Sequence, residues 1–313
     1  MKGLEIAEAF YREHGERMLS EQFPALSGLI AVGLCGSGSE CFGYDDAISR
    51  DHDFEPGFCI FLPDEDLVDR RTAFLLERAY AALPHTFMGL ERSRLDPVGG
   101  NRHGVIRMSE FFRERLGTPD GVPTEQALFF LPEQAIAEVT NGRIFYDGLG
   151  VMSAVRDRLA YFPEDVRLKK LAGCLLLMGQ SGQYNYPRCI ARGETGAAQL
   201  ALAEFVRSAL HAAFLINRKY LPYYKWSFYA LRTLPRLSEI GTDLERLIST
   251  GNTPEEVENK RETVERVTAT ILSALREDRL LTVPSNDAER QAYAVNDRIT
   301  DPTIRNLHIL YGV

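Results

Sequence analysis

Two short apolar runs near the N-terminus constrain the fold most. They read GLIAVGLCG at 28–36 and GFCIFLP at 57–63. Each is a short continuous apolar run bounded by glycine or proline, which is typical of a buried strand. We therefore expect two strands of one sheet, with the stretch between them forming a loop.

Helical patterns flank these strands. The segment 4–23 has apolar residues at helical spacing and ends before Pro24, and the segment 64–83 carries acidic residues in its first turn. Both features favour helices. Three further segments are predicted to be structured: a strand leading into a helix at 103–112, a helix at 132–139, and a strand or turn at 143–147.

The pattern changes at about residue 150, after which only helical segments are expected. These segments are 151–160, 164–180, 196–220, 223–235, 255–277 and 286–295. The predicted fold class is α+β: a mixed sheet with flanking helices in residues 1–150, followed by an all-helical C-terminal domain in residues 151–313.

The composition limits the kinds of partner. The net charge is −8, which disfavours broad attraction to nucleic acid or to an anionic membrane. The five cysteines form no C-x-x-C pair and the N-terminus lacks a signal-peptide layout, so we expect a cytoplasmic protein. The apolar run 171–179 is far shorter than the roughly 20 residues of a membrane span, and none is predicted.

Acidic residues gather just after the first apolar run, where residues 36–54 read GSGSECFGYDDAISRDHDF. If a strand begins at residue 50 and continues toward 61, Asp51 and Asp53 lie on the same face, with Cα atoms roughly 6 to 7 Å apart. Two like charges in this position need a cation. Carboxylates so arranged suit Mg²⁺ or Mn²⁺, so Asp51 and Asp53 are the predicted metal ligands.

A glycine-serine turn precedes these carboxylates. Gly36, Ser37, Gly38 and Ser39 would bring backbone N–H groups and hydroxyls close to a phosphate. A phosphate beside metal-binding carboxylates indicates a nucleotide. Two bound metal ions can stabilise a leaving pyrophosphate.

These residues carry a resemblance. An apolar strand, Gly-Ser, eleven further residues and Asp-x-Asp resemble the signature of the DNA-polymerase-β-like nucleotidyltransferase superfamily. The resemblance implies that Gly38 and Ser39 contact the triphosphate and that Asp51 and Asp53 bind two magnesium ions.

A closer resemblance rests on the stretch 36–54 together with GQYNYPR at 182–188 and NRKYLPYYKW at 217–226. These motifs are similar to an uncharacterised bacterial family, a domain of unknown function, within that superfamily, and the likeness extends over nearly the whole chain. The two-domain plan is similar to that of the kanamycin-type antibiotic nucleotidyltransferases. In those enzymes a helical C-terminal domain holds the acceptor alcohol.

The sequence departs from the superfamily pattern at its third carboxylate. The corresponding strand, GVIRMS at 104–109, contains none, and Glu110 or Asp96 is the candidate substitute. In addition, EPG at 55–57 interrupts the strand expected from residue 50, which indicates a bulge.

The helical domain offers cations for the triphosphate. Lys225 and Arg188 lie among aromatic residues and are the predicted neutralising groups. An ordinary junction between helices, with aromatic residues at its seam, explains the same pattern equally well.

Other interpretations of the acidic stretch are weaker. Asp45 and Asp46 follow a glycine and fit a capped turn better than a metal site. The pair His52 and Asp53 suggests a metal phosphohydrolase, but such sites need further histidines. The glycines miss the spacing of dinucleotide-binding and P-loop motifs.

The predicted function is Mg²⁺-dependent transfer of a nucleoside monophosphate from an NTP, such as ATP, to a hydroxyl group of a small molecule. A protein or a tRNA end is a less favoured acceptor. The alternative is a regulatory protein that binds the nucleotide without turnover. A homodimer remains one option for the assembly.

Overall fold

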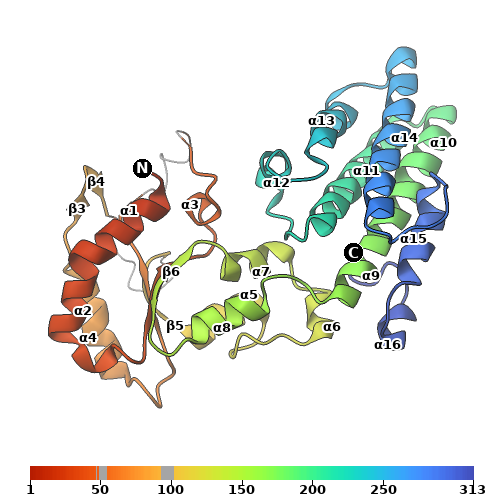
Figure 1. The fold of residues 1–313 in the computed structure, drawn as a ribbon. Coiled ribbons are helices and arrows are strands. Elements are labelled where there is room, and N and C mark those ends of the chain that lie inside the picture. The colour runs from red at the N-terminus through yellow and green to blue at the C-terminus, as the bar shows by residue number, and fades with distance from the viewer. Residues whose placement is uncertain (47, 49–54, 93–101) are drawn as a thin grey trace. The chain divides into compact units, whose positions relative to one another are not determined.

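The computed structural model describes residues 1–46, 48, 55–92 and 102–313. The chain forms two compact units, each described here by itself. The first contains Met1–Pro123 and Gln134–Ala160, and the second contains Thr124–Glu133 and Tyr161–Val313. A single boundary at residue 150 was expected from sequence, whereas the chain crosses between these units three times (Figure 1).

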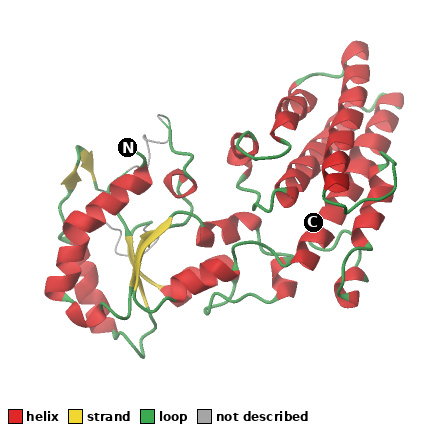
Figure 2. Ribbon diagram, viewed as in Figure 1, coloured by secondary structure: helices red, strands yellow, loops and turns green. Residues whose placement is uncertain are grey.

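The first unit is built around a four-stranded mixed sheet with the order β5-β2-β1-β6 (Figures 1 and 2). Strand β1 is antiparallel to β2 and β6, and β2 is parallel to β5. Two further short strands form a separate antiparallel hairpin. The strands are β1 (Ala31–Leu34), β2 (Cys59–Leu62), β3 (Thr86–Phe87), β4 (Leu90–Glu91), β5 (Gly104–Arg107) and β6 (Arg143–Asp147).

The mixed sheet and its flanking helices confirm the coarse fold prediction, but β2 is shorter than expected. From sequence this strand was expected to begin at residue 50, whereas β2 begins at Cys59 and the described residues 55–58 lie outside it. Pro56 has no N–H to donate to a neighbouring strand, which explains the late start. Residues 55–58 therefore do not extend β2 back toward Asp51 and Asp53.

Helices cover both faces of the sheet. Helices α1 and α2 are joined by a π-helical turn at Tyr11–Gly15, and α2 ends before Pro24, as predicted, where a short 3-10 turn (Pro24–Leu26) follows. Helix α4 begins later than expected because Asp69 caps it by accepting a hydrogen bond from the Thr72 N–H (2.8 Å). The helices are α1 (Gly3–Phe10), α2 (Glu16–Gln22), α3 (Ser39–Phe42), α4 (Arg70–Ala81), α5 (Met108–Leu116), α7 (Glu133–Thr140) and α8 (Val151–Arg158).

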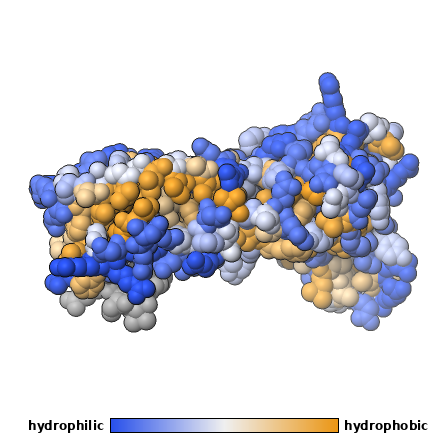
Figure 3. All heavy atoms as spheres, turned by 90° about the horizontal axis from the view of Figure 1, so that it is seen from below, coloured by the Kyte–Doolittle hydropathy of each residue, from blue (hydrophilic) through white to orange (hydrophobic). Residues whose placement is uncertain are grey.

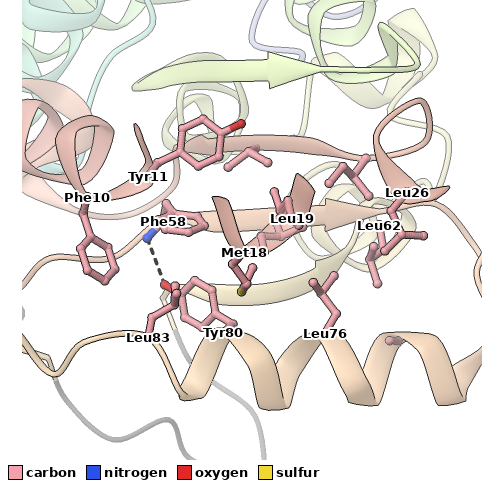
Figure 4. Close-up of a cluster of buried hydrophobic side chains, with 14 of the residues drawn as sticks. Phe10, Tyr11, Met18, Leu19, Leu26, Phe58, Leu62, Leu76, Tyr80 and Leu83 are labelled. Atoms are coloured by element: carbon pink, nitrogen blue, oxygen red, sulfur yellow. Dashed lines mark hydrogen bonds between the residues drawn. The ribbon is translucent and has the colours of Figure 1, made fainter. Parts of the chain in front are cut away.

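A large apolar cluster joins α1, α2 and α4 to one face of the sheet (Figure 4). Phe58 stands at its centre, and the Tyr80 ring lies edge-on to it with centroids 5.1 Å apart. The Tyr80 hydroxyl also accepts a hydrogen bond from the Phe58 N–H (3.1 Å), which satisfies a buried donor just before β2. On the opposite face, Phe61 packs against Phe111 of α5.

The second unit is helical. Helices α9 and α11 bury most of their length and form its centre. The predicted helix at 164–180 does not stop there, because a π-helical turn at Gly179–Asn185 continues it into α10. The helices are α6 (Glu125–Leu128), α9 (Glu164–Met178), α10 (Tyr186–Ala191), α11 (Thr195–Ile216), α12 (Tyr224–Leu231), α13 (Gly241–Ser249), α14 (Pro254–Glu277), α15 (Ala288–Asn296) and α16 (Pro302–Arg305).

Among the described helices, α11 alone is long and apolar enough to cross a membrane by length and composition. Its most apolar stretch is 61% buried within the protein, as in the central helix of a packed helical core. Figure 3 shows one face of the molecule, where hydrophobic residues form a band across the first unit with hydrophilic residues around it.

Two buried lysines on α9 hold the C-terminal segment. Lys169 Nζ donates to the carbonyl oxygens of Arg305 (3.1 Å) and Leu307 (2.7 Å). Lys170 Nζ donates to the carbonyl oxygens of Phe129 (3.0 Å) and Gly312 (2.8 Å). Burial lowers the pKa of both amines, and these acceptors offset the cost of taking them out of water.

The centre of this unit also contains a buried polar chain. His211 Nε2 lies 2.6 Å from Glu133 Oε1, and His211 Nδ1 lies 3.3 Å from Cys174 Sγ. The second carboxylate oxygen of Glu133 accepts a hydrogen bond from the Leu221 N–H (2.8 Å). The pair of Glu133 and His211 therefore joins α11, the start of α7 and the segment before α12.

Candidate functional site

The glycine-serine loop leaves the C-terminal end of β1 and leads into α3. Gly36 has φ +127°, a conformation that side chains disfavour, so glycine is required there. The Asn141 side chain clamps this residue: its Oδ1 accepts from the Gly36 N–H (2.9 Å) and its Nδ2 donates to the Gly36 carbonyl (2.7 Å). The loop is therefore held in one conformation from a point 105 residues away in sequence.

Asn141 is itself held in place. Arg156 Nη1 donates to the carbonyl oxygens of Asn141 (2.7 Å) and Val139 (2.9 Å). The next residue, Gly142, has φ +59°, and a Cβ there would collide with the Leu34 carbonyl at the end of β1. The turn before β6 thus lies directly against the end of β1.

A cavity of about 600 Å³ opens at this edge of the sheet, where β1 ends and β2 and β5 begin. Its wall includes Gly36, Ser37 and Gly38 from the loop. The rest of the wall comes from the end of β1, from α3, α4 and α5, and from the starts of β2 and β5 with the residues just before β5. This volume falls in the range of small-molecule sites.

Three arginines and three glutamates line the cavity. They are Arg78, Arg102 and Arg115, and Glu77, Glu110 and Glu114. The Arg102 guanidinium pairs with the buried carboxylate of Glu40 beside Gly38. Exposed Arg78 makes no ion pair with any carboxylate in the described part of the chain.

Arg115 approaches the glycine loop at Gly36, whereas Arg102 lies against Gly38. A Cβ built on Gly36 would lie 3.6 Å from an Nη atom of Arg115. The guanidinium stacks over the Phe111 ring at 4.2 Å and lies 3.3 Å from a Glu114 oxygen and 3.4 Å from a Glu138 oxygen. The aromatic ring and the carboxylates fix its direction.

Three thiols form part of the cavity wall. Burial raises the pKa of Cys35 to about 11, and it also raises the pKa of Cys41 and of Cys59. The thiols are therefore protonated at neutral pH and contribute an apolar surface. This agrees with their interpretation from sequence as small buried hydrophobic residues.

The structure brings together four of the predicted site residues. Gly36, Ser37, Gly38 and Glu110 line the same cavity, although Glu110 lies on α5, far from the loop in sequence. Ser39 begins α3 and is not among the described residues that line the cavity.

Asp51, Asp53 and Asp96 lie outside the described residues, as does His52, so their predicted roles stay predictions. Asp45 and Asp46 have structural contacts, in keeping with a capped turn. Asp45 pairs with Lys2 (3.3 Å), and Asp46 accepts a hydrogen bond from the Ile48 N–H (2.9 Å).

Lys225 and Arg188 belong to the second unit. Lys225 Nζ lies 5.1 Å from the centre of a ring of Trp226, and the Arg188 guanidinium lies 4.6 Å from that of Tyr184. Their predicted part in nucleotide binding stays a prediction.

Sequence reasoning missed the groups that shape this site, above all Asn141, Arg115 and Arg102. Asn141 is followed by glycine, a common turn signal, but nothing in the sequence links that turn to residue 36. The arginines lie on a helix face and beside a strand, where solvent exposure is the usual outcome.

The arrangement defines an α+β protein with a charged cavity at the edge of a mixed sheet and a separate helical unit. Residues 129–227 match the model of a domain of unknown function (DUF4037). The chain thus contains a segment similar to an uncharacterised domain family. No curated protein matches the chain.

The matched segment includes two of the three motifs on which the closer resemblance rests, at 182–188 and 217–226. It also includes Glu133, Cys174 and His211. The acidic stretch 36–54 lies outside it, so the match is narrower than the whole-chain likeness expected from sequence.

Proposed function

We propose that this protein is a Mg²⁺-dependent nucleotidyltransferase that moves a nucleoside monophosphate from an NTP to a hydroxyl group of a small molecule. One observation carries the proposal: the glycine-serine loop, Glu110 and three arginines line one cavity at the edge of the sheet where β2 begins. The Asp-x-Asp motif precedes β2 in the chain, and the proposal assigns its carboxylates to this cavity.

The loop has donors available for a phosphate. The Gly36 N–H is used by Asn141, but the N–H groups of Ser37 and Gly38 donate to no acceptor within the described residues. Backbone N–H groups in a glycine turn bind phosphate oxygens well. In this proposal Ser37 and Gly38 hold the phosphate, and Asn141 keeps the turn in its binding conformation.

Whether the cavity can hold Mg²⁺ depends on the acidic stretch at 36–54. Within the described residues, no group of three or more His, Cys, Asp or Glu side chains is placed to hold a metal ion. The exposed carboxylate of Glu110 lines the cavity, and the proposal completes the ligand set with Asp51 and Asp53. When bound, Mg²⁺ would neutralise charge on the phosphates.

Arg115 is the proposed cation for the charge that develops on the departing pyrophosphate. We expect Arg115→Ala to lower the rate of pyrophosphate release about 100-fold, because removing one positioned donor of this kind has an effect of that size. Arg113→Ala is the matched control, since Arg113 is an exposed arginine of the same helix that does not line the cavity.

Pyrophosphate release from single NTPs, followed by a coupled phosphate assay, measures this effect. Arg115→Lys should recover part of the rate, because it keeps the charge but loses the planar fork. Melting curves of all three variants separate a loss of catalysis from a loss of folding. Equal rates for Arg113→Ala and Arg115→Ala would contradict the assignment.

The rival is a regulatory protein that binds the nucleotide without turnover. It is favoured by the absence of a carboxylate from β5, which reads GVIR, and by the incomplete metal set among the described residues. Both hypotheses predict that an NTP binds to the first unit.

A direct test adds a mixed NTP pool and a panel of alcohols to the protein, with Mg²⁺ or with EDTA. The enzyme should release pyrophosphate only with Mg²⁺ and should join the nucleotide to one of the alcohols, as detected by mass spectrometry. NTP binding without release across the panel would favour the rival, and no NTP binding would overturn both.

A further inference from the structure

An exposed cluster of aromatic and basic side chains lies at α12 in the second unit. We call it the α12 surface; it consists of Tyr223, Tyr224, Lys225, Tyr229 and Arg232. All five residues are exposed, and Tyr224 reaches 75%. Large aromatic side chains usually bury their rings, so a cluster of exposed rings indicates a surface that binds a partner.

The helix separates the cluster from the apolar core. Lys225, Tyr229 and Arg232 follow the i, i+4, i+7 spacing that places side chains on one face. Ala230 and Leu231 are buried instead. The outer face of α12 is therefore a row of cation, aromatic ring and cation.

The rings lie close to one another and to the cations. The Tyr223 and Tyr224 centroids are 4.3 Å apart, and the Arg232 guanidinium lies 5.7 Å from the centre of the Tyr229 ring. Lys225 lies beside Trp226, as described above. Flat ring faces and positive charges thus alternate over a short distance.

The charge of this region is opposite to that of the chain. Residues 217–232 contain Arg218, Lys219, Lys225 and Arg232 and no acidic residue, although the protein carries a net charge of −8. Arg218 pairs with Glu164 (2.8 Å). The other three cations form no ion pair with a carboxylate among the described residues.

We infer that the α12 surface binds single-stranded nucleic acid, with phosphates on Lys225 and Arg232 and bases stacked on the tyrosines. Alternating aromatic rings and cations are how proteins hold single strands without reading the sequence. The net charge of the chain argues against broad attraction of nucleic acid, but this local surface has the complementary charge.

A membrane surface fits less well. Helices that lie in a lipid interface insert a continuous apolar face that includes large aliphatic side chains, whereas the aliphatic residues of α12, Ala230 and Leu231, are buried in the protein. A ring with a hydroxyl still stacks on a base through its face.

The test uses fluorescence anisotropy with labelled twelve-residue oligo-U and oligo-dT, in EDTA and without NTP. These conditions make the result independent of the proposed function. The parent should bind both strands, and its affinity should fall as salt rises. Lys225→Ala/Arg232→Ala should reduce the slope of log K against log salt by about 1.4, since each phosphate contact contributes about 0.7 for single strands.

Stacking is tested separately. Tyr224→Ala/Tyr229→Ala should weaken binding at least tenfold with little change in the salt slope, while Tyr224→Phe/Tyr229→Phe should retain it, because the ring faces remain. Arg192→Ala/Arg290→Ala removes the same charge from exposed positions elsewhere in this unit, and Tyr293→Ala removes an exposed ring from α15. Both controls should bind like the parent.

Three results would overturn the inference. The first is no binding by the parent at 50 mM salt, and the second is an equal loss in the control variants. The third is binding to phosphatidylserine vesicles, but not to the oligonucleotides, that the α12 variants abolish. All variants are surface changes, and circular dichroism verifies that they fold.

Discussion

Asp51→Ala/Asp53→Ala is expected to abolish Mg²⁺-dependent pyrophosphate release, with a fall of about 1,000-fold or more. The proposed function assigns the metal to these two carboxylates. A bound metal supplies several kcal/mol of charge stabilisation in the transition state, and about 4 kcal/mol corresponds to a factor of about 1,000. The measurement is the initial rate of pyrophosphate release at saturating NTP and Mg²⁺.

Asp46→Ala is the matched control for this change. Asp46 lies in the same acidic stretch, but its side chain accepts a hydrogen bond from the Ile48 N–H within the turn, so its loss should leave the rate close to that of the parent. Asp51→Asn/Asp53→Asn keeps the side-chain shape and should be as inactive as the alanine variant. An active asparagine variant would show that the metal, if any, is held elsewhere.

Glu133→Ala is expected to destabilise the second unit by about 3–5 kcal/mol, because removing one partner of a buried ion pair leaves the other charge uncompensated. The side chains of Glu133 and His211 are only 8% and 15% exposed. The change also leaves the half-buried Leu221 N–H without its acceptor. Trp226, the single tryptophan, lies in this unit, so urea unfolding followed by its fluorescence measures the effect.

Glu245→Ala is the control for that measurement. Glu245 is an exposed glutamate on α13 with no ion pair among the described residues, and surface changes of this kind usually alter stability by less than about 0.5 kcal/mol. Equal unfolding curves for the two variants would contradict a stabilising role for the buried pair.

The same pair predicts a pH dependence. Burial by itself would lower the pKa of His211, but Cys174 and Glu133 outweigh it and raise that pKa from 6.5 to about 10. Burial would raise the pKa of Glu133, but His211 and the Leu221 N–H hold it below its usual 4.5. The stability that His211 contributes is fully present below pH 6.5 and is lost as the pH rises toward 10. The stability that Glu133 contributes is fully present above pH 4.5 and is lost as the pH falls through its lowered pKa.

The stability difference between the parent and Glu133→Gln should therefore be largest between pH 4.5 and 6.5 and should shrink from pH 6.5 to 10. Urea unfolding at a series of pH values measures it. A difference that stays constant over this range would show that His211 is neutral in the folded protein.

Local patterns in the sequence determined most of the secondary structure. The apolar runs at 28–36 and 57–63 contain β1 and β2, and the helical spacing at 255–277 corresponds to α14 within one residue. Such patterns are readable because a strand or helix must place its apolar side chains on one face or bury them all. Pro56 and Gly57 signal the interruption before β2, although the predicted strand ran through them.

Part of the candidate site was also accessible from sequence. The loop at 36–38 was predicted because glycines and a serine after a buried strand are typical of a phosphate-binding turn. Glu110 was predicted because it is the first carboxylate after the strand at 104–109, which contains none. Both inferences used residue type and chain position alone. They could not show that the loop and Glu110 share one cavity.

Only the tertiary structure decided which distant groups complete the cavity. Asn141 reaches Gly36 because β6 pairs with β1, and Arg115 approaches the same glycine because α5 packs on the sheet. Likewise, Lys169 and Lys170 appear as ordinary surface lysines in the sequence, but they are buried on backbone carbonyls. Periodicity within a segment reports which face is buried, whereas the partner across the contact depends on the packing of the whole unit, and no local pattern encodes it.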